Sequence, residues 1–136
     1  MTDQESMVTR QSELTQVLTG IQTDLGQPIW VALVDDDGLM VASVPESLAL
    51  GSERIAAMTA AGVIPAKRVL GEVDGGTLRF VTFAGSKAQV LVVAVDQKRF
   101  LSIGLNPHVS VQSTFSPLSN WVPKLLKILK KRYSRR

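Results

Sequence analysis

The feature that most constrains the fold is a run of three apolar segments separated by very short links. Residues 77–83 (TLRFVTF), 88–95 (AQVLVVAV) and 99–105 (RFLSIGL) have the length and composition of β-strands, and only four and three residues connect them. Links this short form hairpins between antiparallel strands, because a parallel crossover needs a much longer connection. The segment 88–95 is apolar on both faces, which is typical of a central strand. The chain therefore predicts an antiparallel meander.

A helix and two further strands precede the meander. Apolar residues at helical spacing, followed by Gly26 and Pro28, predict a helix over about 7–25. The apolar segments 29–34 (IWVALV) and 39–44 (LMVASV) predict two strands. Together with the meander they predict one five-stranded antiparallel sheet, which the helices of the chain must cover.

A second helix is expected at about 52–71. Its apolar stripe consists of Ile55, Met58, Gly62, Ala66, Val69 and Leu70. Pro65 lies inside this segment, where it removes one backbone hydrogen bond and crowds the carbonyl group of Ala61. We therefore expect either a kink or two shorter helices.

The last helix is expected to begin near Ser119 and to run to about Tyr133, after a loop over 106–119. The predicted order is α-β-β-α-β-β-β-α, an α/β (α+β) fold. The whole chain, residues 1–136, is expected to form a single domain with a basic helix and tail at 119–136.

Charge is divided unevenly along the chain. Residues 1–96 contain all 12 acids and 6 bases, whereas residues 97–136 contain 9 bases and no acid. The chain has no cysteine, which excludes disulfides and thiolate sites and favours a cytoplasmic location. The polar N-terminus does not resemble a signal peptide, and the longest apolar run is far shorter than a membrane span.

The three consecutive aspartates at 35–37 have three interpretations. A receiver domain would begin with its first strand and would carry a phosphoacceptor aspartate after a later buried strand, yet Asp74 precedes a strand and Asp96 lies in a turn. A calcium loop needs ligands at alternating positions. An Asp-Gly pair between two apolar strands predicts a hairpin turn, with Asp35 and Asp36 as solvated turn residues.

Other chemistry has little support in the sequence. The only histidine, His108, is expected in a loop without a nearby acid, and the glycines of 71–76 (GEVDGG) precede a strand, not a phosphate-binding helix N-terminus. Trp30 and Trp121 are expected to be core or interface anchors. We therefore predict no catalytic residue, no cofactor and no metal ion.

The basic C-terminal segment 121–136 (WVPKLLKILKKRYSRR) has two open interpretations. Its apolar side predicts a helix that docks on the sheet, with lysines that favour the C-terminal end of the helix dipole. Its basic side predicts contact with an acidic partner, an anionic membrane surface or nucleic acid, of which nucleic acid is the least expected. The residues expected to make this contact are Lys130, Lys131, Arg132, Arg135 and Arg136.

The order of these elements, with "VALVDDDGLMVAS", "SERIAAMTAA" and the meander, resembles the roadblock / dynein light chain family, close to bacterial and archaeal regulators of Ras-like GTPases. The resemblance covers about residues 7–105. Such domains are similar to longin and profilin-like domains, and the resemblance implies the sheet order 2-1-5-4-3. The strand at 77–83 is then an apolar edge that invites pairing with another chain.

The resemblance also implies a dimer built from the second helix and the third strand. The interface residues expected from it are Ile55, Met58, Gly62, Leu78, Phe80 and Val81. Pro65 departs from the smooth second helix of the family, so it bears on the dimer packing.

These observations lead to a non-enzymatic, homodimeric regulator or scaffold of a small Ras-like GTPase that modulates its nucleotide cycle. Two alternatives stay open at this point. One is an adaptor that acts at a membrane or in a complex through its basic helix, with a peripheral location. The other is a small-molecule sensor, for which a roomy apolar cavity with a few polar groups would be needed.

Overall fold

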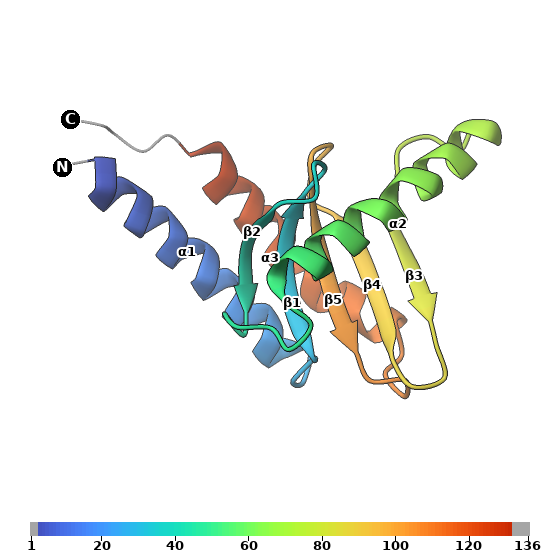
Figure 1. Ribbon diagram of the computed structural model, residues 1–136, viewed down its shortest axis with the longest axis horizontal. Helices are drawn as coiled ribbons and strands as arrows, with labels where there is room; N and C mark the ends of the chain where they lie inside the picture. The colour runs from blue at the N-terminus through green and yellow to red at the C-terminus, as the bar shows by residue number, and fades with distance from the viewer. Residues whose placement is uncertain (1–2, 132–136) are drawn as a thin grey trace.

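The computed structural model describes residues 3–131, and side chains are described from Arg10 onward. The described residues form three helices and five strands in the predicted order. Figure 1 shows their arrangement in space. The elements are α1 (Asp3–Asp24), β1 (Trp30–Asp35), β2 (Met40–Val44), α2 (Ser52–Glu72), β3 (Phe80–Ala84), β4 (Gln89–Ala94), β5 (Arg99–Leu105) and α3 (Gln112–Lys130).

All five strands form one antiparallel sheet in the order β2-β1-β5-β4-β3. Both short links of the meander are hairpins, as predicted, and β1 and β5 occupy the interior of the sheet, where nearly every residue is buried. β2 and β3 are the edges. The fold class and the strand order expected from the sequence are therefore confirmed.

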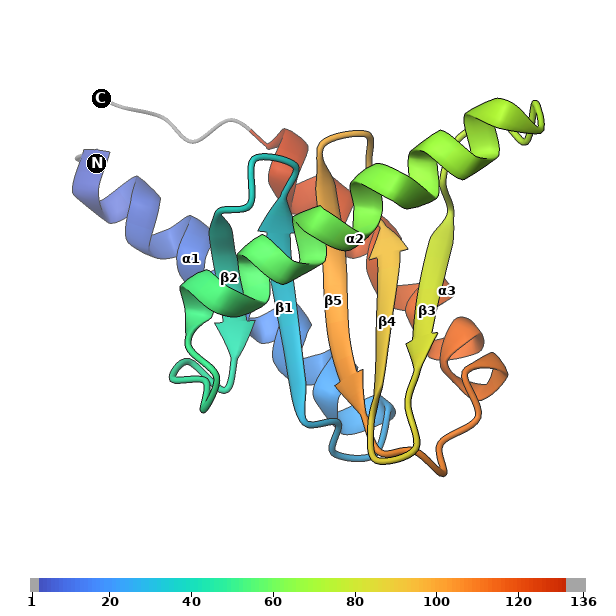
Figure 2. The same cartoon turned by 45° about the vertical axis from the view of Figure 1, so that its right-hand side comes forward.

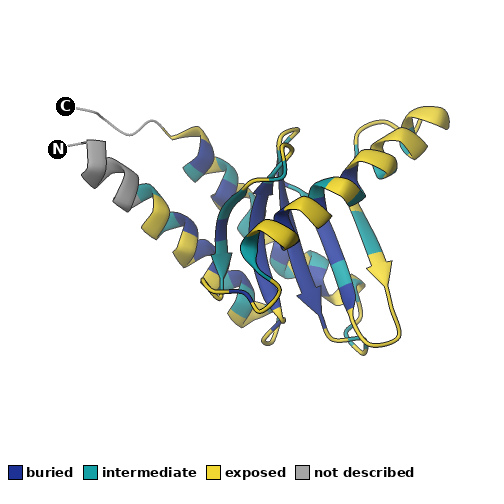
Figure 3. Ribbon diagram, viewed as in Figure 1, coloured by how far each residue is buried: buried dark blue, intermediate teal, exposed yellow. Residues whose placement is uncertain are grey.

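Helices cover the two faces of the sheet unequally. α1 and α3 lie side by side behind the sheet, whereas α2 alone crosses the front face diagonally from β2 toward β3 (Figure 2). Side chains alternate along each strand, so Val31 and Leu33 of β1 pack toward α1 and α3, while Trp30 and Val34 pack toward α2. One helix cannot cover a whole five-stranded face, and the residues on α2 and β3 are the most exposed of the front face (Figure 3).

The two helices behind the sheet, α1 and α3, pack closely where Gly20 of α1 meets Trp121 of α3. A Cβ atom at this position would lie 2.3 Å from the ring of Trp121 in α3, so the absence of a side chain lets the indole lie against α1. The indole Nε1–H of Trp121 donates to Asp24 Oδ2 at 2.6 Å, and the Lys124 Nζ lies 4.4 Å from the ring centroid. Trp121 is thus an internal anchor, as predicted.

Two expectations about the helices are corrected. α2 is one helix from Ser52 to Glu72 with Pro65 inside it, so of the two expected outcomes the split into shorter helices is excluded. Pro65 and Ala61 are both exposed, so water is available to the carbonyl group that the proline leaves without its usual donor. α3 begins at Gln112 rather than near Ser119. The early turns bury Thr114 and Leu118, and this packing outweighs the proline at position 117.

Candidate interaction surfaces

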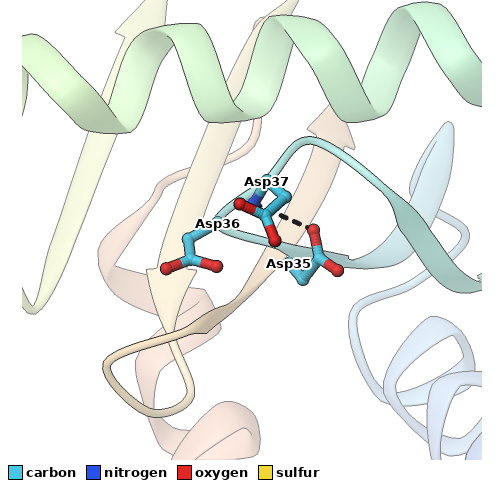
Figure 4. A group of neighbouring side chains, drawn as sticks. All are labelled: Asp35, Asp36 and Asp37. Carbon is cyan, nitrogen blue, oxygen red and sulfur yellow. Dashed lines mark hydrogen bonds between the residues drawn. The ribbon is translucent and has the colours of Figure 1, made fainter.

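The aspartates at 35–37 form the turn between β1 and β2, as predicted (Figure 4). The N–H of Gly38 donates to the carbonyl oxygen of Asp35 at 3.1 Å, and Gly38 has a φ of 82°. Asp37 does not have a positive φ, so only the glycine uses the left-handed region. The turn therefore depends on Gly38 for its positive φ. The hydrogen bond from the N–H of Gly38 to the carbonyl oxygen of Asp35 closes the turn.

Asp35 is more than a solvated turn residue. Its Oδ1 accepts hydrogen bonds from the N–H groups of Asp37 at 3.0 Å and Leu39 at 2.9 Å. The side chain thus satisfies two backbone donors that the turn leaves free, which is an Asx-turn. Sequence analysis predicted the turn and missed this role, although an Asp at the first turn position is its usual signal.

The three carboxylates lie close together, with one oxygen of each within 4.8 Å of the others. The hydrogen bonds of Asp35 already account for its position, and Asp36 and Asp37 are exposed. The turn also packs on its surroundings: the N–H of Asp36 donates to the carbonyl oxygen of Lys98 at 2.8 Å. The geometry is that of a structural turn.

Along the border of its buried face, α2 carries apolar side chains that stay largely exposed. The helix buries Ile55, Ala56, Thr59 and Val63 against the sheet. At the helical period, Met58, Gly62 and Val69 lie along one line beside these residues. Met58 is 40% exposed and Val69 is 63% exposed. From Met58 onward, the stripe seen in the sequence is therefore only partly covered by the chain's own sheet.

Phe83 of β3 extends this apolar stripe onto the edge of the sheet. A Cβ atom at Gly62 would lie 2.9 Å from Cζ of Phe83, so the ring lies directly against the helix where the helix has no side chain. Phe83 is nevertheless 47% exposed. We name Met58, Gly62, Val69 and Phe83 the α2–β3 surface.

The residues predicted for the interface fall into four groups. Ile55 is 1% exposed and packs in the core of its own chain, so its side chain is covered before any partner binds. Leu78 and Val81 are half-buried on the α2 face of the sheet, beside Val63 and Phe100. Met58 and Gly62 lie on the α2–β3 surface.

Phe80, the remaining predicted interface residue, points to the opposite face of β3. It is 46% exposed, and its ring centroid lies 4.8 Å from that of Phe115 in α3. Sequence analysis missed Phe83, although the two-residue period of a strand places it on the same face as Val81.

Two open grooves flank the β3 side of the sheet. The first, about 570 Å³, lies between α2 and the β4–β5 turn, with Lys67, Asp96, Lys98 and Phe100 among its lining residues. Lys67 Nζ lies 5.2 Å from the centroid of the Phe100 ring and donates to the carbonyl oxygen of Gln97 at 3.5 Å. This groove opens to solvent and does not enclose polar groups in an apolar cavity, so it lacks the feature that a small-molecule sensor would need.

The second groove, about 450 Å³, lies between β3 and α3. Phe80, Phe115, Leu118 and Val122 form most of its apolar lining, and Ser119 adds a hydroxyl group. It lies on the opposite face of β3 from the α2–β3 surface.

The C-terminal helix places its bases on the outside. Leu125 and Leu129 are buried against the sheet, whereas Lys124, Lys127 and Lys130 are exposed. Lys131, also predicted as a contact residue, forms an ion pair with Glu13 Oε1 at 3.1 Å. The predicted contact residues Arg132, Arg135 and Arg136 lie outside the described residues. Among residues 3–131, no helix combines the length and the apolar character that crossing a bilayer requires.

A five-stranded antiparallel sheet in this order, with one helix on one face and two on the other, defines the class of roadblock and profilin-like domains. The Roadblock/LC7 domain family matches residues 14–104, and the chain belongs to this family.

Solved structures with a similar fold agree with this assignment. MglB of Myxococcus xanthus superposes with a TM-score of 0.79 at 17% sequence identity, covering 90% of this chain and 94% of that one. A Roadblock/LC7 domain from Streptomyces avermitilis gives 0.77 at 14% identity, covering 85% and 97%. Profilin II of Acanthamoeba castellanii gives 0.53 at 18% identity, covering 80% and 95%. A comparison with curated protein sequences finds no match.

Proposed function

We propose that this chain is a non-enzymatic homodimer that binds a small Ras-like GTPase in the cytoplasm and modulates its nucleotide cycle, as a regulator or as a scaffold. Membership of the Roadblock/LC7 family supports the GTPase partner. The chemistry on the chain supports a role without catalysis. Its one histidine, His108, is exposed in the loop between β5 and α3, and no described carboxylate bonds to it.

The observation that carries the dimer is the α2–β3 surface. Met58, Val69 and Phe83 are large apolar side chains with 40%, 63% and 47% of their surfaces exposed, on one helix face and the adjoining sheet edge. Burial of apolar area stabilises association by about 25 cal/mol per Å², and contiguous apolar patches on a protein surface usually mark interaction sites. A second copy offers the same apolar surface and the same free strand.

The proposed action on the GTPase is a change in its own switch loops. Arg54, Arg68 and Arg79 are exposed on this chain, but none is held by a described ion pair in a fixed orientation. An arginine finger works by presenting a positioned guanidinium group to the transition state. None of these three presents such a group, so the proposed acceleration of hydrolysis comes from reordering the switch loops.

The test uses a Ras-like GTPase from the same organism, loaded with GDP or with a non-hydrolysable GTP analogue. We expect binding with a preference for one nucleotide state and a changed rate of hydrolysis or exchange, measured by calorimetry and phosphate release. Variants at Arg54, Arg68 and Arg79 should each retain most of the effect. Loss of most of the acceleration in one of them, with binding intact, would contradict the reordering mechanism, and no binding in either state would contradict the proposed function.

A second candidate function rests on a separate observation. The exposed side chains of Lys124, Lys127 and Lys130 give α3 one basic side. No described carboxylate bonds to these three side chains. Such a side is suited to an anionic lipid surface, which would make the chain an adaptor at the membrane.

A further inference from the structure

The acidic side chains are distributed unevenly between the two faces of the sheet. From Arg10 onward, the two helices behind the sheet carry two carboxylates, those of Glu13 and Asp24 in α1, and α3 carries none. The other described carboxylates lie in α2, in the loops next to it, or in the turns between strands: Asp35, Asp36, Asp37, Glu46, Glu53, Glu72, Asp74 and Asp96. The side of the molecule formed by α1 and α3 is therefore poor in acids (Figure 2).

Both carboxylates of α1 bond to residues at or just beyond the C-terminal half of α3. Glu13 Oε1 forms an ion pair with Lys131 Nζ at 3.1 Å. Asp24 Oδ2 accepts a hydrogen bond from the indole Nε1–H of Trp121 at 2.6 Å. These bonds place Glu13 and Asp24 at the junction of the two helices, and not on the side of α1 that faces away from the sheet.

The side of α1 that faces away from the sheet is polar but uncharged. The helix buries its apolar residues against the sheet: Leu14, Val17, Leu18 and Ile21. At the helical period, four exposed residues fall on the opposite side: Ser12, Gln16, Thr19 and Thr23. An exposed helix face usually includes charged side chains. This one offers hydrogen-bonding groups without a charge that would repel an anion.

The outward side of α3 supplies positive charge next to this uncharged side. Opposite the buried Leu125 and Leu129, the helix exposes Lys124, Lys127 and Lys130. The three lysines are three residues apart, so they follow one another along about 9 Å of the helix. We name the residues on the outward sides of the two helices the α1–α3 face: Ser12, Gln16, Thr19, Thr23, Lys124, Lys127 and Lys130.

The spacing of these lysines suits an extended anionic surface better than a compact anion. A compact phosphate group is held by groups that converge on it, in a pocket or at a helix N-terminus. Neither of the two grooves described above has one of these lysines in its lining. A bilayer with anionic headgroups needs no pocket, because its negative potential acts on every base that lies near the surface.

We propose that the α1–α3 face lies against an anionic lipid bilayer, so that both α1 and α3 meet the lipid. This placement rests on the second candidate function, the membrane adaptor, and adds which helices form the contact. α2 crosses the other face of the sheet, so the α2–β3 surface points away from the lipid (Figure 2). A protein partner can then bind at α2 while the chain stays on the bilayer.

New charges on α1 test this placement, because α1 contributes no base of its own to the α1–α3 face. In a sedimentation assay, the natural chain should bind vesicles of equal parts phosphatidylcholine and phosphatidylserine, and should not bind phosphatidylcholine alone. Gln16→Glu combined with Thr19→Glu should weaken binding by about fivefold for each added charge, and Gln16→Lys combined with Thr19→Lys should strengthen it by about as much. Both differences should shrink at high salt.

A matched pair on α2 is the control. Ala57 and Ala61 are exposed on the helix that crosses the other face of the sheet. Ala57→Glu combined with Ala61→Glu changes the net charge equally, but places the charges more than a Debye length of about 8 Å from the lipid. Binding should therefore stay within about twofold of the natural chain. Equal losses for the α1 pair and the α2 pair would assign the effect to net charge and overturn the placement.

The remaining outcomes separate the placement from the adaptor function. If changing Lys124, Lys127 and Lys130 to Glu weakens vesicle binding while both α1 pairs bind like the natural chain, α3 meets the lipid without α1. That result overturns the placement and leaves the adaptor function standing. A natural chain that does not bind the phosphatidylserine vesicles overturns both. If it binds a GTPase instead, and the α1 Glu pair weakens that binding, the face belongs to a protein partner.

Discussion

At the residue scale, single side chains close the turns, and glycines allow neighbouring elements to pack closely. Asp35 closes the β1–β2 turn through two backbone donors, and Gly38 supplies its positive φ. Gly20 and Gly62 have no Cβ atom where Trp121 and Phe83 lie against their helices. These are positions where one methyl group changes the packing.

The first prediction concerns Asp35. Asp35→Ala should lower the free energy of unfolding by about 1–2 kcal/mol, because two backbone N–H groups of the turn lose their acceptor. Asp35→Asn keeps an Oδ1 acceptor, so its free energy of unfolding should be close to that of the natural chain. The exposed neighbour Asp36 provides the control. Asp36→Ala should leave the free energy of unfolding, measured with urea, nearly unchanged. Equal losses for Asp35→Ala and Asp36→Ala would mean that charge, and not the turn hydrogen bonds, is responsible.

The second prediction concerns the contact between α1 and α3. Gly20→Ala should destabilise the fold by about 1–3 kcal/mol, since its Cβ would lie 2.3 Å from the Trp121 ring. Gly71→Ala is a matched control in α2: nothing lies within 4 Å of its Cβ position, so the gain in helix propensity should stabilise by up to about 1 kcal/mol. Thermal melts of both variants check this, and a Gly20→Ala variant as stable as Gly71→Ala would refute the fitted contact.

At the element scale, the strands were more predictable than the helix faces. The short links of the meander left only hairpins, so its pairing followed from the sequence. The apolar residues of α2 form one wide band, and period alone could not tell that Ile55 and Val63 would be buried while Met58 and Val69, at its border, stayed exposed. The early start of α3 depends on long-range burial of Leu118, which outweighs the local signal of Pro117.

The third prediction tests the α2–β3 surface. Phe83→Lys should split the dimer, because a charged side chain would have to be desolvated where two apolar surfaces meet. Leu39→Lys is the control: Leu39 is 62% exposed, in the turn between β1 and β2, and should leave the dimer intact. Analytical ultracentrifugation distinguishes the two. A dimer that survives Phe83→Lys with unchanged affinity would exclude this surface as the interface.

The fourth prediction tests the basic side of α3. Changing Lys124, Lys127 and Lys130 together to Glu should weaken binding to vesicles that contain phosphatidylserine, and the difference from the natural chain should shrink at high salt. The same change at Arg10, Lys87 and Lys98 alters net charge equally and is the control. Equal loss of binding in both triple variants would assign the effect to net charge, and no loss in either would leave these lysines as a solvated helix face.

At the scale of the whole molecule, the unequal covering of the sheet is the central feature. Two helices cover one face and one helix crosses the other, and the apolar residues left exposed lie at one helix and one strand edge. The sequence predicted the fold because short links and strand periodicity act locally. Strand period placed Phe83 on the same face as Val81, but its exposure, and the lack of a partner for the Thr82 hydroxyl, depend on where α2 and α3 pack.

The most direct test of the account is the mass of the natural chain in solution. Light scattering coupled to size exclusion at micromolar concentration should give about twice the 14.7 kDa of one chain, and Phe83→Lys should give a single chain under the same conditions. A natural chain that stays at the mass of one copy as its concentration rises would contradict the dimer on which the proposed function rests.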